Sequence, residues 1–218
     1  MTEGPPLNPQ DPKRTGHRWL DLAVALFALL ISSASIFVAY QSNQSMERLV
    51  RAGSWPFLQL GSGNVSDDGE RQIAFAVSNV GTGPARIHDF EVKVDGAALP
   101  QEGHLLTNVL RACCDAEFRA AVAAAGGDVV AIYGDEVSSP VSRRFLAPND
   151  DVTAMRWPRS DTNAALWAAL DTARQTGRIT QSVCYCSVFD DCWVARSDAF
   201  PPEEVNSCES AALQTRRD

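Results

Sequence analysis

The chain has 218 residues, of which 45 % are hydrophobic and 21 % are charged. These proportions are those of a folded protein, and they exclude a wholly disordered chain. The formal net charge of −8 argues against nucleic acid as a partner, because binding to phosphates needs a basic face. Six cysteines are a clear excess, and none of them lies before Cys113.

An apolar segment near the N-terminus is the strongest feature of the sequence. Residues 1–19 are polar, and the segment 20–40 that follows is apolar, with no charge from Leu22 through Met46. A helix of this length spans about 31 Å, close to the thickness of the hydrocarbon core of a bilayer. The sequence therefore predicts a cytoplasmic tail at 1–19 and a transmembrane helix at 20–40 that contacts membrane lipid.

The orientation of this helix follows from the charges and cysteines around it. Three basic residues lie in the tail before the span, whereas two, Arg48 and Arg51, follow it, and the cytoplasmic flank is the more basic one. All six cysteines come after the span, and disulfides form in oxidising compartments. We therefore expect a single-pass protein of the inner (plasma) membrane with a cytoplasmic N-terminus. Residues 41–218 are then outside, which in a bacterium is the periplasm.

A cleaved signal peptide is the alternative, because the small residues 32–34 resemble a cleavage site. The apolar run continues through residues 36–38 instead of ending there, which favours an uncleaved signal anchor. Beyond the span, Met46, Leu49 and Val50 recur at helical spacing up to Gly53. This pattern predicts a helical stalk at 41–53.

From Trp55 onwards, apolar residues alternate with polar ones, as they do in strands with one buried face. We expect strands near 57–60, 73–77, 90–94, 129–133, 141–146 and 152–157, and a closing hairpin from 178–189 and 192–196. Two helices interrupt them: one from Leu106 to the glycines at 126 and 127, and one capped by Asp161 and ended by Gly177.

These elements together predict an immunoglobulin-like β-sandwich at 54–200 with two helical insertions. The tail at 201–218 is polar, and we expect it to be loose except where Cys208 ties it down. Four tryptophans are expected in the core of the domain: Trp55, Trp157, Trp167 and Trp193.

Three segments carry a resemblance to a known group of proteins. They are SWPFLQL at 54–60, SNVGTGPARI at 78–87 and CYCSVFDDCW at 184–193. In this order after an apolar span, they resemble uncharacterised bacterial single-pass membrane-anchored proteins with a periplasmic β-sandwich-like domain. The resemblance covers most of the chain after residue 20, and its motifs are structural. It therefore implies a location and a fold, and no established activity.

The cysteines are expected to form disulfides, and the hairpin loop decides how three of them pair. With a two-residue loop at 190–191, Cys192 faces away from Cys184 and Cys186. With a loop at 187–191, Cys186 and Cys192 lie opposite each other and can bond. The remaining bonds would then link the hairpin to Cys208 and to one of the adjacent pair, Cys113 and Cys114.

No motif for catalysis, cofactor binding or nucleotide binding is present in the sequence. The three histidines, His17, His88 and His104, are expected to be solvated surface residues. The leading prediction is a membrane-anchored, non-enzymatic periplasmic interaction module that binds another protein and needs no cofactor. The alternative is a periplasmic thiol-redox or metal-binding protein, because Cys184 and Cys186 share one face of a strand and thiolates bind soft metal ions.

Overall fold

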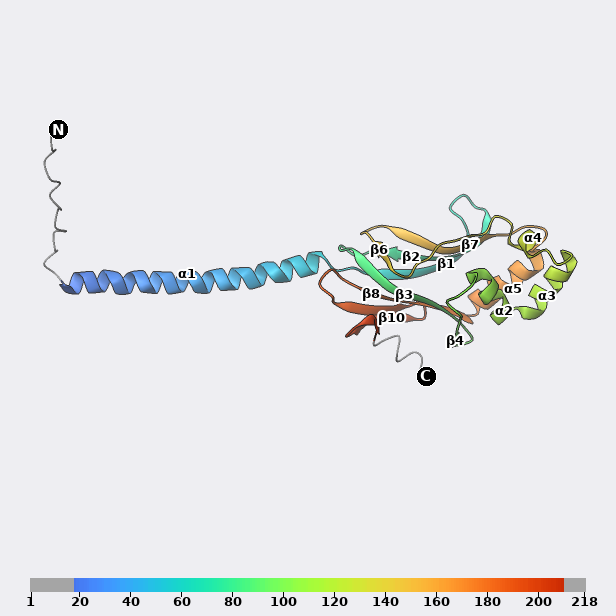
Figure 1. The fold of residues 1–218 in the computed structure, drawn as a ribbon. Coiled ribbons are helices and arrows are strands. Elements are labelled where there is room, and N and C mark those ends of the chain that lie inside the picture. The colour runs from blue at the N-terminus through green and yellow to red at the C-terminus, as the bar shows by residue number, and fades with distance from the viewer. Residues whose placement is uncertain (1–17, 210–218) are drawn as a thin grey trace, which may run out of the picture. The chain divides into compact units, whose positions relative to one another are not determined.

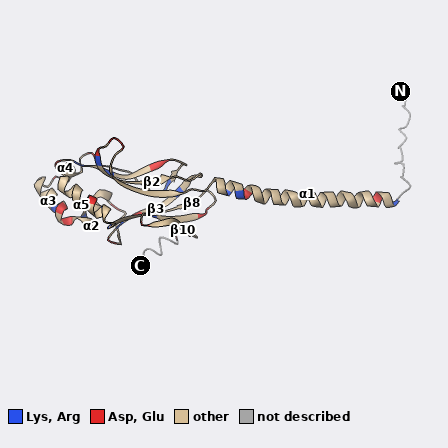
Figure 2. Ribbon diagram, turned by 180° about the vertical axis from the view of Figure 1, so that it is seen from behind, with Lys and Arg blue, Asp and Glu red and all other residues tan. Residues whose placement is uncertain are grey.

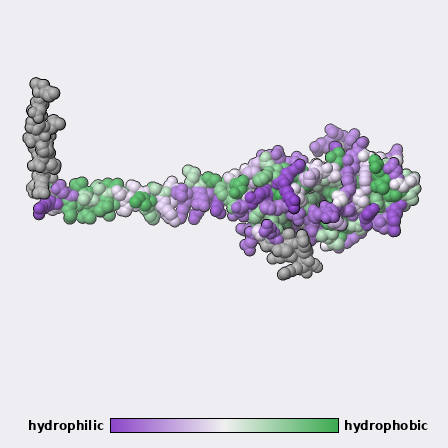
Figure 3. Space-filling model, viewed as in Figure 1, coloured by the Kyte–Doolittle hydropathy of each residue, from purple (hydrophilic) through white to green (hydrophobic). Residues whose placement is uncertain are grey.

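The structure is a computed structural model that describes residues 18–209 (Figure 1). The chain divides into two units, with the division between Leu49 and Val50. Helix α1 (Arg18–Gly53) is a single helix of 36 residues, and none of its residues is buried. Its charged residues lie only near its two ends (Figure 2), and apolar side chains cover much of the rest (Figure 3). By length and composition it can cross a membrane, with a mean hydropathy of 2.5 over its most apolar window.

The rest of the chain is mostly β structure in two antiparallel sheets. The first sheet has the strand order β1 (Leu58–Val65), β2 (Arg71–Asn79), β7 (Asp151–Pro158) and β5 (Val137–Ser138). The second has the order β10 (Ala199–Val205), β9 (Cys192–Arg196), β8 (Ile179–Cys186), β3 (Ala85–Val94) and β4 (Ala97–Ala98), and β6 (Arg144–Leu146) also pairs with β3. An apolar helix followed by a mostly-β domain confirms the coarse fold prediction.

The core lies between the two sheets, which form two layers in Figure 1. It is built by strands in which every second side chain points inward, so that Phe75 on β2 and Val92 on β3 belong to one cluster. Trp157 and Tyr185 are its largest fully buried side chains. Trp55 differs from expectation, because 48 % of its surface is exposed.

Helices gather at one end of the sheets (Figure 1) and are more numerous than predicted. They are α2 (Leu105–Cys113), α3 (Asp115–Ala124), α4 (Val129–Tyr133) and α5 (Ala164–Gln175). The first insertion is split because Cys114 leaves helical geometry, with φ −146° and ψ 41°. The strand predicted at 129–133 is wrong: Asp128 caps a short helix there by accepting hydrogen bonds from the backbone N–H groups of Val130 and Ala131.

Three further boundaries differ from the predictions. Helix α5 begins after Asn163, not at a cap formed by Asp161. Only 144–146 of the strand expected at 141–146 is a strand. The tail is not loose from its start, because β10 pairs with β9, with Val205 opposite Cys192. The ends of the two predicted tails, residues 1–17 and 210–218, lie outside the described residues.

Asn79, at the end of β2, joins three parts of the domain through a fully buried side chain. Its amide NH2 donates to the carbonyl oxygens of Gly83 (2.9 Å), Leu146 (3.1 Å) and Ala147 (3.2 Å), and its amide oxygen accepts from the N–H groups of Phe57 (3.3 Å) and Gly81 (3.1 Å). Each polar atom is thereby satisfied without water.

The two glycines after Asn79 let the chain pass close to the start of the domain. A Cβ atom at Gly81 would overlap the backbone of Trp55 and Phe57, and one at Gly83 would overlap the backbone of Ser54. The segments 54–60 and 78–87 therefore form one corner that fixes the start of β1. Their close backbone contact requires glycine at positions 81 and 83.

Candidate functional site

The β8–β9 hairpin has the five-residue loop 187–191. Ser187 closes it: its backbone N–H donates to the carbonyl of Asp191 (2.8 Å), and its hydroxyl oxygen accepts from the N–H of Phe189 (3.1 Å). This loop places Cys186 opposite Cys192 in the ladder, and the two form a disulfide with Cα atoms 4.0 Å apart. The structure therefore has the second of the two hairpin geometries considered from the sequence.

The other four cysteines also form disulfides. Cys184 pairs with Cys208, with Cα atoms 5.6 Å apart, which attaches the C-terminal segment to the hairpin. Cys113 pairs with Cys114, its neighbour in sequence, between α2 and α3. The expected link from this adjacent pair to the hairpin is therefore wrong, because the two cysteines satisfy each other.

Four of these sulfurs form one cluster, which we call the hairpin cysteine cluster: Cys184, Cys186, Cys192 and Cys208. All four cysteines are buried. Tyr185, between two of them in β8, points to the opposite face and into the main core, as strand alternation requires. Burial raises the pKa of Tyr185 to about 12, despite the lowering effect of a hydrogen bond with the backbone of Leu58.

The two disulfides of the cluster approach each other closely. The Sγ atoms of Cys186 and Cys208 belong to different disulfides and are 3.8 Å apart. A ring nitrogen of His88 and these two sulfurs all lie within 4.8 Å of one another. An imidazole and two disulfides therefore meet at one place on the second sheet.

His88 lies on the face of the second sheet that carries the cluster, at an irregularity in β3. In the pairing with β8, Ile87 lies opposite Tyr185 and Asp89 lies opposite Cys184, so His88 is an extra residue in the ladder. Such a bulge redirects a side chain, and bulges are common next to active sites. Nε2 of His88 accepts a hydrogen bond from Nε of Arg86 (3.1 Å), which leaves the proton of the neutral ring on Nδ1.

An open pocket of about 560 Å³ lies beside this cluster. Cys208 and His88 are on its wall, together with polar and charged residues: Asp89, Gln101, Ser142, Arg143 and Glu209. Arg143 has a positive φ of 59°, which is uncommon for a residue other than glycine, asparagine or aspartate. The pocket gives an outside molecule a route to one end of the Cys184–Cys208 disulfide.

The predicted metal ligands are both occupied in this structure. Cys184 and Cys186 are bonded to other cysteines, and the ligand form of cysteine is the thiolate. None of the cysteines in residues 18–209 is free. In the oxidised state the cluster can take part in thiol–disulfide exchange, whereas metal binding would need its reduction.

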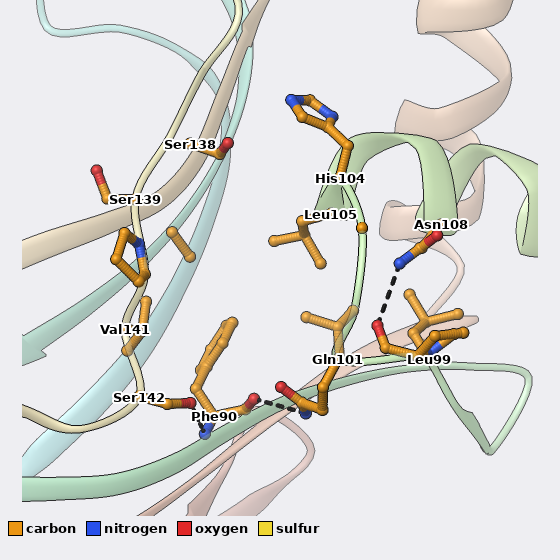
Figure 4. A pocket seen from close by; sticks show the side chains of 15 residues that line it. Phe90, Leu99, Gln101, His104, Leu105, Asn108, Ser138, Ser139, Val141 and Ser142 are labelled. Atoms are coloured by element: carbon orange, nitrogen blue, oxygen red, sulfur yellow. Dashed lines mark hydrogen bonds between the residues drawn. The ribbon is translucent and has the colours of Figure 1, made fainter.

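A second pocket, of about 360 Å³, lies between the start of α2 and β5 (Figure 4). His104 and Ser138 lie on opposite walls of it. His104 is not a simple solvated histidine: its Nε2 lies 3.0 Å from a carboxylate oxygen of Glu136, and its ring stacks on Tyr133 at 5.0 Å. The side chain of Glu136 is only 6 % exposed. Within the described part of the chain, Nδ1 of His104 has no hydrogen-bond partner.

An exposed aromatic cluster lies at the start of the domain. The rings of Trp55 and Phe57 are 5.5 Å apart, and those of Phe57 and Phe200 are 6.0 Å apart. Phe200 is 81 % exposed. Trp55 is also exposed, whereas Phe57 between them is half-buried. Exposed apolar patches are typical of surfaces that bind other proteins.

Comparison of the chain with protein-family models, with curated proteins and with solved structures gives no match. The candidate site is therefore inferred from its geometry alone. The sequence identified the cysteines but not the place of His88 beside them or the pairing of His104 with Glu136, because contacts between separate segments leave no periodic signal. His17 lies outside the described residues.

Proposed function

We propose that the protein is a single-pass membrane protein whose α1 is an uncleaved signal anchor and whose mostly-β domain lies in the periplasm, where it binds another protein. On this proposal residues 20–40 contact lipid and the N-terminus is cytoplasmic. The domain acts on its partner by binding it and not as an enzyme. The proposal agrees with the resemblance to bacterial membrane-anchored proteins with periplasmic β-sandwich-like domains.

The exposure of α1 is the observation that carries the anchor. A core helix of a soluble protein buries its apolar side chains, whereas Leu22 and Phe27 are 64 % and 66 % exposed. Serines within the apolar stretch do not need water either, because the hydroxyls of Ser33 and Ser35 donate to carbonyls one turn earlier, at 2.8 Å. Such a helix is stable when lipid surrounds it.

The composition of the domain supports an oxidising compartment outside the membrane. All six cysteines form disulfides, which persist in the periplasm and in other oxidising compartments. The acidic excess also belongs to this part: residues 1–40 carry three acidic and three basic residues, which leaves 24 and 16 of the 27 and 19 for residues 41–218. Two antiparallel sheets over one core support an immunoglobulin-like architecture.

The exposed aromatic cluster supports the interaction role. Trp55 and Phe200 present aromatic rings to solvent on either side of the half-buried Phe57, and tryptophan is one of the residues that contribute most to the binding energy of interfaces. The anchor would keep this surface at the membrane, where a membrane or periplasmic partner reaches it.

Two measurements test the proposal. The full chain, expressed in a bacterium, is expected to stay in the membrane after washing with alkaline carbonate and to leave it only with detergent. A photo-crosslinking residue at Phe200 is expected to give a discrete adduct with one protein, and the same residue at exposed Asp67 is expected to give none. Recovery in the soluble fraction would refute the anchor, and equal adducts at both positions would refute the binding surface.

A further inference from the structure

The two disulfides of the hairpin cysteine cluster are closer to each other than a purely structural role requires. Two disulfides lie in van der Waals contact, with the Sγ atoms of Cys186 and Cys208 at 3.8 Å. One of the two disulfides ends at the wall of an open pocket, through Cys208. Thiol–disulfide exchange needs a thiolate next to a disulfide sulfur, and this contact supplies that arrangement as soon as either bond opens.

We propose that this cluster is a thiol–disulfide exchange site that accepts two electrons from an external dithiol and passes them between its two disulfides. This role is independent of the anchor and of the protein partner proposed above.

The exchange with a dithiol takes three successive thiolate attacks. One thiolate of the dithiol enters the pocket and attacks Sγ of Cys208; the bond to Cys184 breaks, and Cys184 leaves as a thiolate. The second thiolate of the dithiol attacks the mixed disulfide, which releases the oxidised dithiol and the thiolate of Cys208. This thiolate attacks Sγ of Cys186 and breaks its bond to Cys192. The product has a Cys186–Cys208 disulfide, and the two protons of the dithiol are now on Cys184 and Cys192.

His88 and its neighbours favour the thiolate form at the centre of this exchange. A ring nitrogen lies within 4.8 Å of both Sγ atoms, and an imidazole N–H is a hydrogen-bond donor for a thiolate. Arg86 donates to Nε2 of His88 and also pairs with Asp190, which holds the guanidinium group beside the ring. Positive charge and hydrogen-bond donors lower the pKa of a thiol and make it a better leaving group.

The position of His88 separates this site from inert disulfides. Ile87 and Tyr185 lie opposite each other and point into the main core, so His88 lies on the other face of the sheet, together with Cys184 and Cys186. The bulge leaves His88 outside the ladder, and one of its ring nitrogens lies within 4.8 Å of the two sulfurs. The adjacent pair Cys113 and Cys114 provides a contrast within the same protein, because it is far from the cluster in the chain and shares no disulfide contact with it in the described residues.

Two single substitutions in the full chain, purified in mild detergent, test the exchange without any added reductant. Cys184→Ser leaves Cys208 as a free thiol beside the Cys186–Cys192 bond, and Cys192→Ser leaves Cys186 as a free thiol beside the Cys184–Cys208 bond. We expect both variants to contain the Cys186–Cys208 disulfide, with the free thiol on Cys192 in the first and on Cys184 in the second. Acid quenching, alkylation and cleavage after Tyr185 and Phe189 separate these cysteines for mass mapping.

The matched control is Cys113→Ser, which leaves Cys114 as a free thiol away from the cluster. Its free thiol is expected to remain on Cys114. A free thiol that stays on Cys208 in Cys184→Ser and on Cys186 in Cys192→Ser would overturn the proposal, and so would a control thiol that exchanges equally with the cluster. Near-ultraviolet circular dichroism of each variant shows whether the domain is folded, and unfolded material is removed before the mapping.

A third variant tests the part assigned to His88. His88→Gln is expected to slow the reaction of the cluster with dithiothreitol by about three- to tenfold near neutral pH, because a cysteine thiolate that loses a hydrogen-bond donor is a poorer leaving group. The rates are compared at several pH values and expressed per dithiothreitol thiolate, so that they report the leaving group and not the attacking thiol. The charged groups around the ring, Arg86, Asp190, Asp89, Arg143 and Glu209, are unchanged in this variant. Equal rates at all pH values would remove His88 from the site.

Discussion

Replacement of the buried Asn79 by alanine is the sharpest test of the packing account. Its amide oxygen is the acceptor for the backbone N–H groups of Phe57 and Gly81, and both would lose this partner inside the corner. A buried polar group without a partner costs about 1–3 kcal/mol. These two bonds are part-buried, and the bonds from the NH2 group to the carbonyls of Gly83 and Leu146 are fully buried, so we expect a total loss of about 2–6 kcal/mol. The corner that holds the start of β1 loosens as well.

The assay is urea unfolding of the full chain in mild detergent, followed by the fluorescence of the buried Trp157 and Trp167. Thr82→Ala is the matched control, because Thr82 lies in the same corner but is exposed, and its hydroxyl makes only hydrogen bonds of 3.4 Å. The control is expected to change the free energy of unfolding by less than about 0.5 kcal/mol. A loss below about 1 kcal/mol for Asn79→Ala would refute the reasoning, since an orphaned buried donor costs at least that much.

Three further predictions concern the glycines, the disulfides and one carboxylate. Gly83→Ala is expected to destabilise the domain by at least about 2 kcal/mol because its Cβ overlaps the backbone of Ser54, whereas at Gly61 the nearest atom to a Cβ is 3.9 Å away; equal effects in urea titrations would contradict this. Replacement of both cysteines by serine is expected to cost about 3.5 kcal/mol for Cys184–Cys208 and about 2.4 kcal/mol for Cys186–Cys192, because the bridged segments differ in length; the reverse order would count against it. Burial raises the pKa of Asp171, but hydrogen bonds from Asn64, Arg174 and Gln175 outweigh it and hold the pKa below 3.8. The stabilisation by Asp171 is therefore complete above about pH 4 and lost as the pH falls through the lowered pKa, so the difference from Asp171→Asn should shrink in acid; a constant difference in unfolding titrations would disprove this.

Helices and strands could be predicted from the sequence where their apolar pattern extends over enough residues. Strand β3 carries Phe90, Val92 and Val94 on one face, and the apolar run of α1 extends over five turns or more. The five apolar residues Val129–Tyr133 fit a strand and a helix equally well, and the cap at Asp128 decided for a helix.

Only part of the candidate site could be predicted from the sequence. The sequence placed Cys184 and Cys186 on one face of a strand and left the pairing to the loop length, which Ser187 fixes through its own hydrogen bonds. The approach of Cys208 to Cys186 depends on how the C-terminal segment returns to β8, and the position of His88 beside them depends on the pairing of β3 with β8. Neither leaves a pattern in a single sequence, because both arise from contacts between distant segments.

The location of the domain is the central claim, and protease accessibility tests it most directly. Spheroplasts that express the full chain with a C-terminal tag are treated with protease, with and without prior lysis. The account predicts that the tag is lost from intact spheroplasts while a cytoplasmic marker protein survives, and that the protein is in the membrane fraction. A tag that is protected until the cells are lysed would contradict the account.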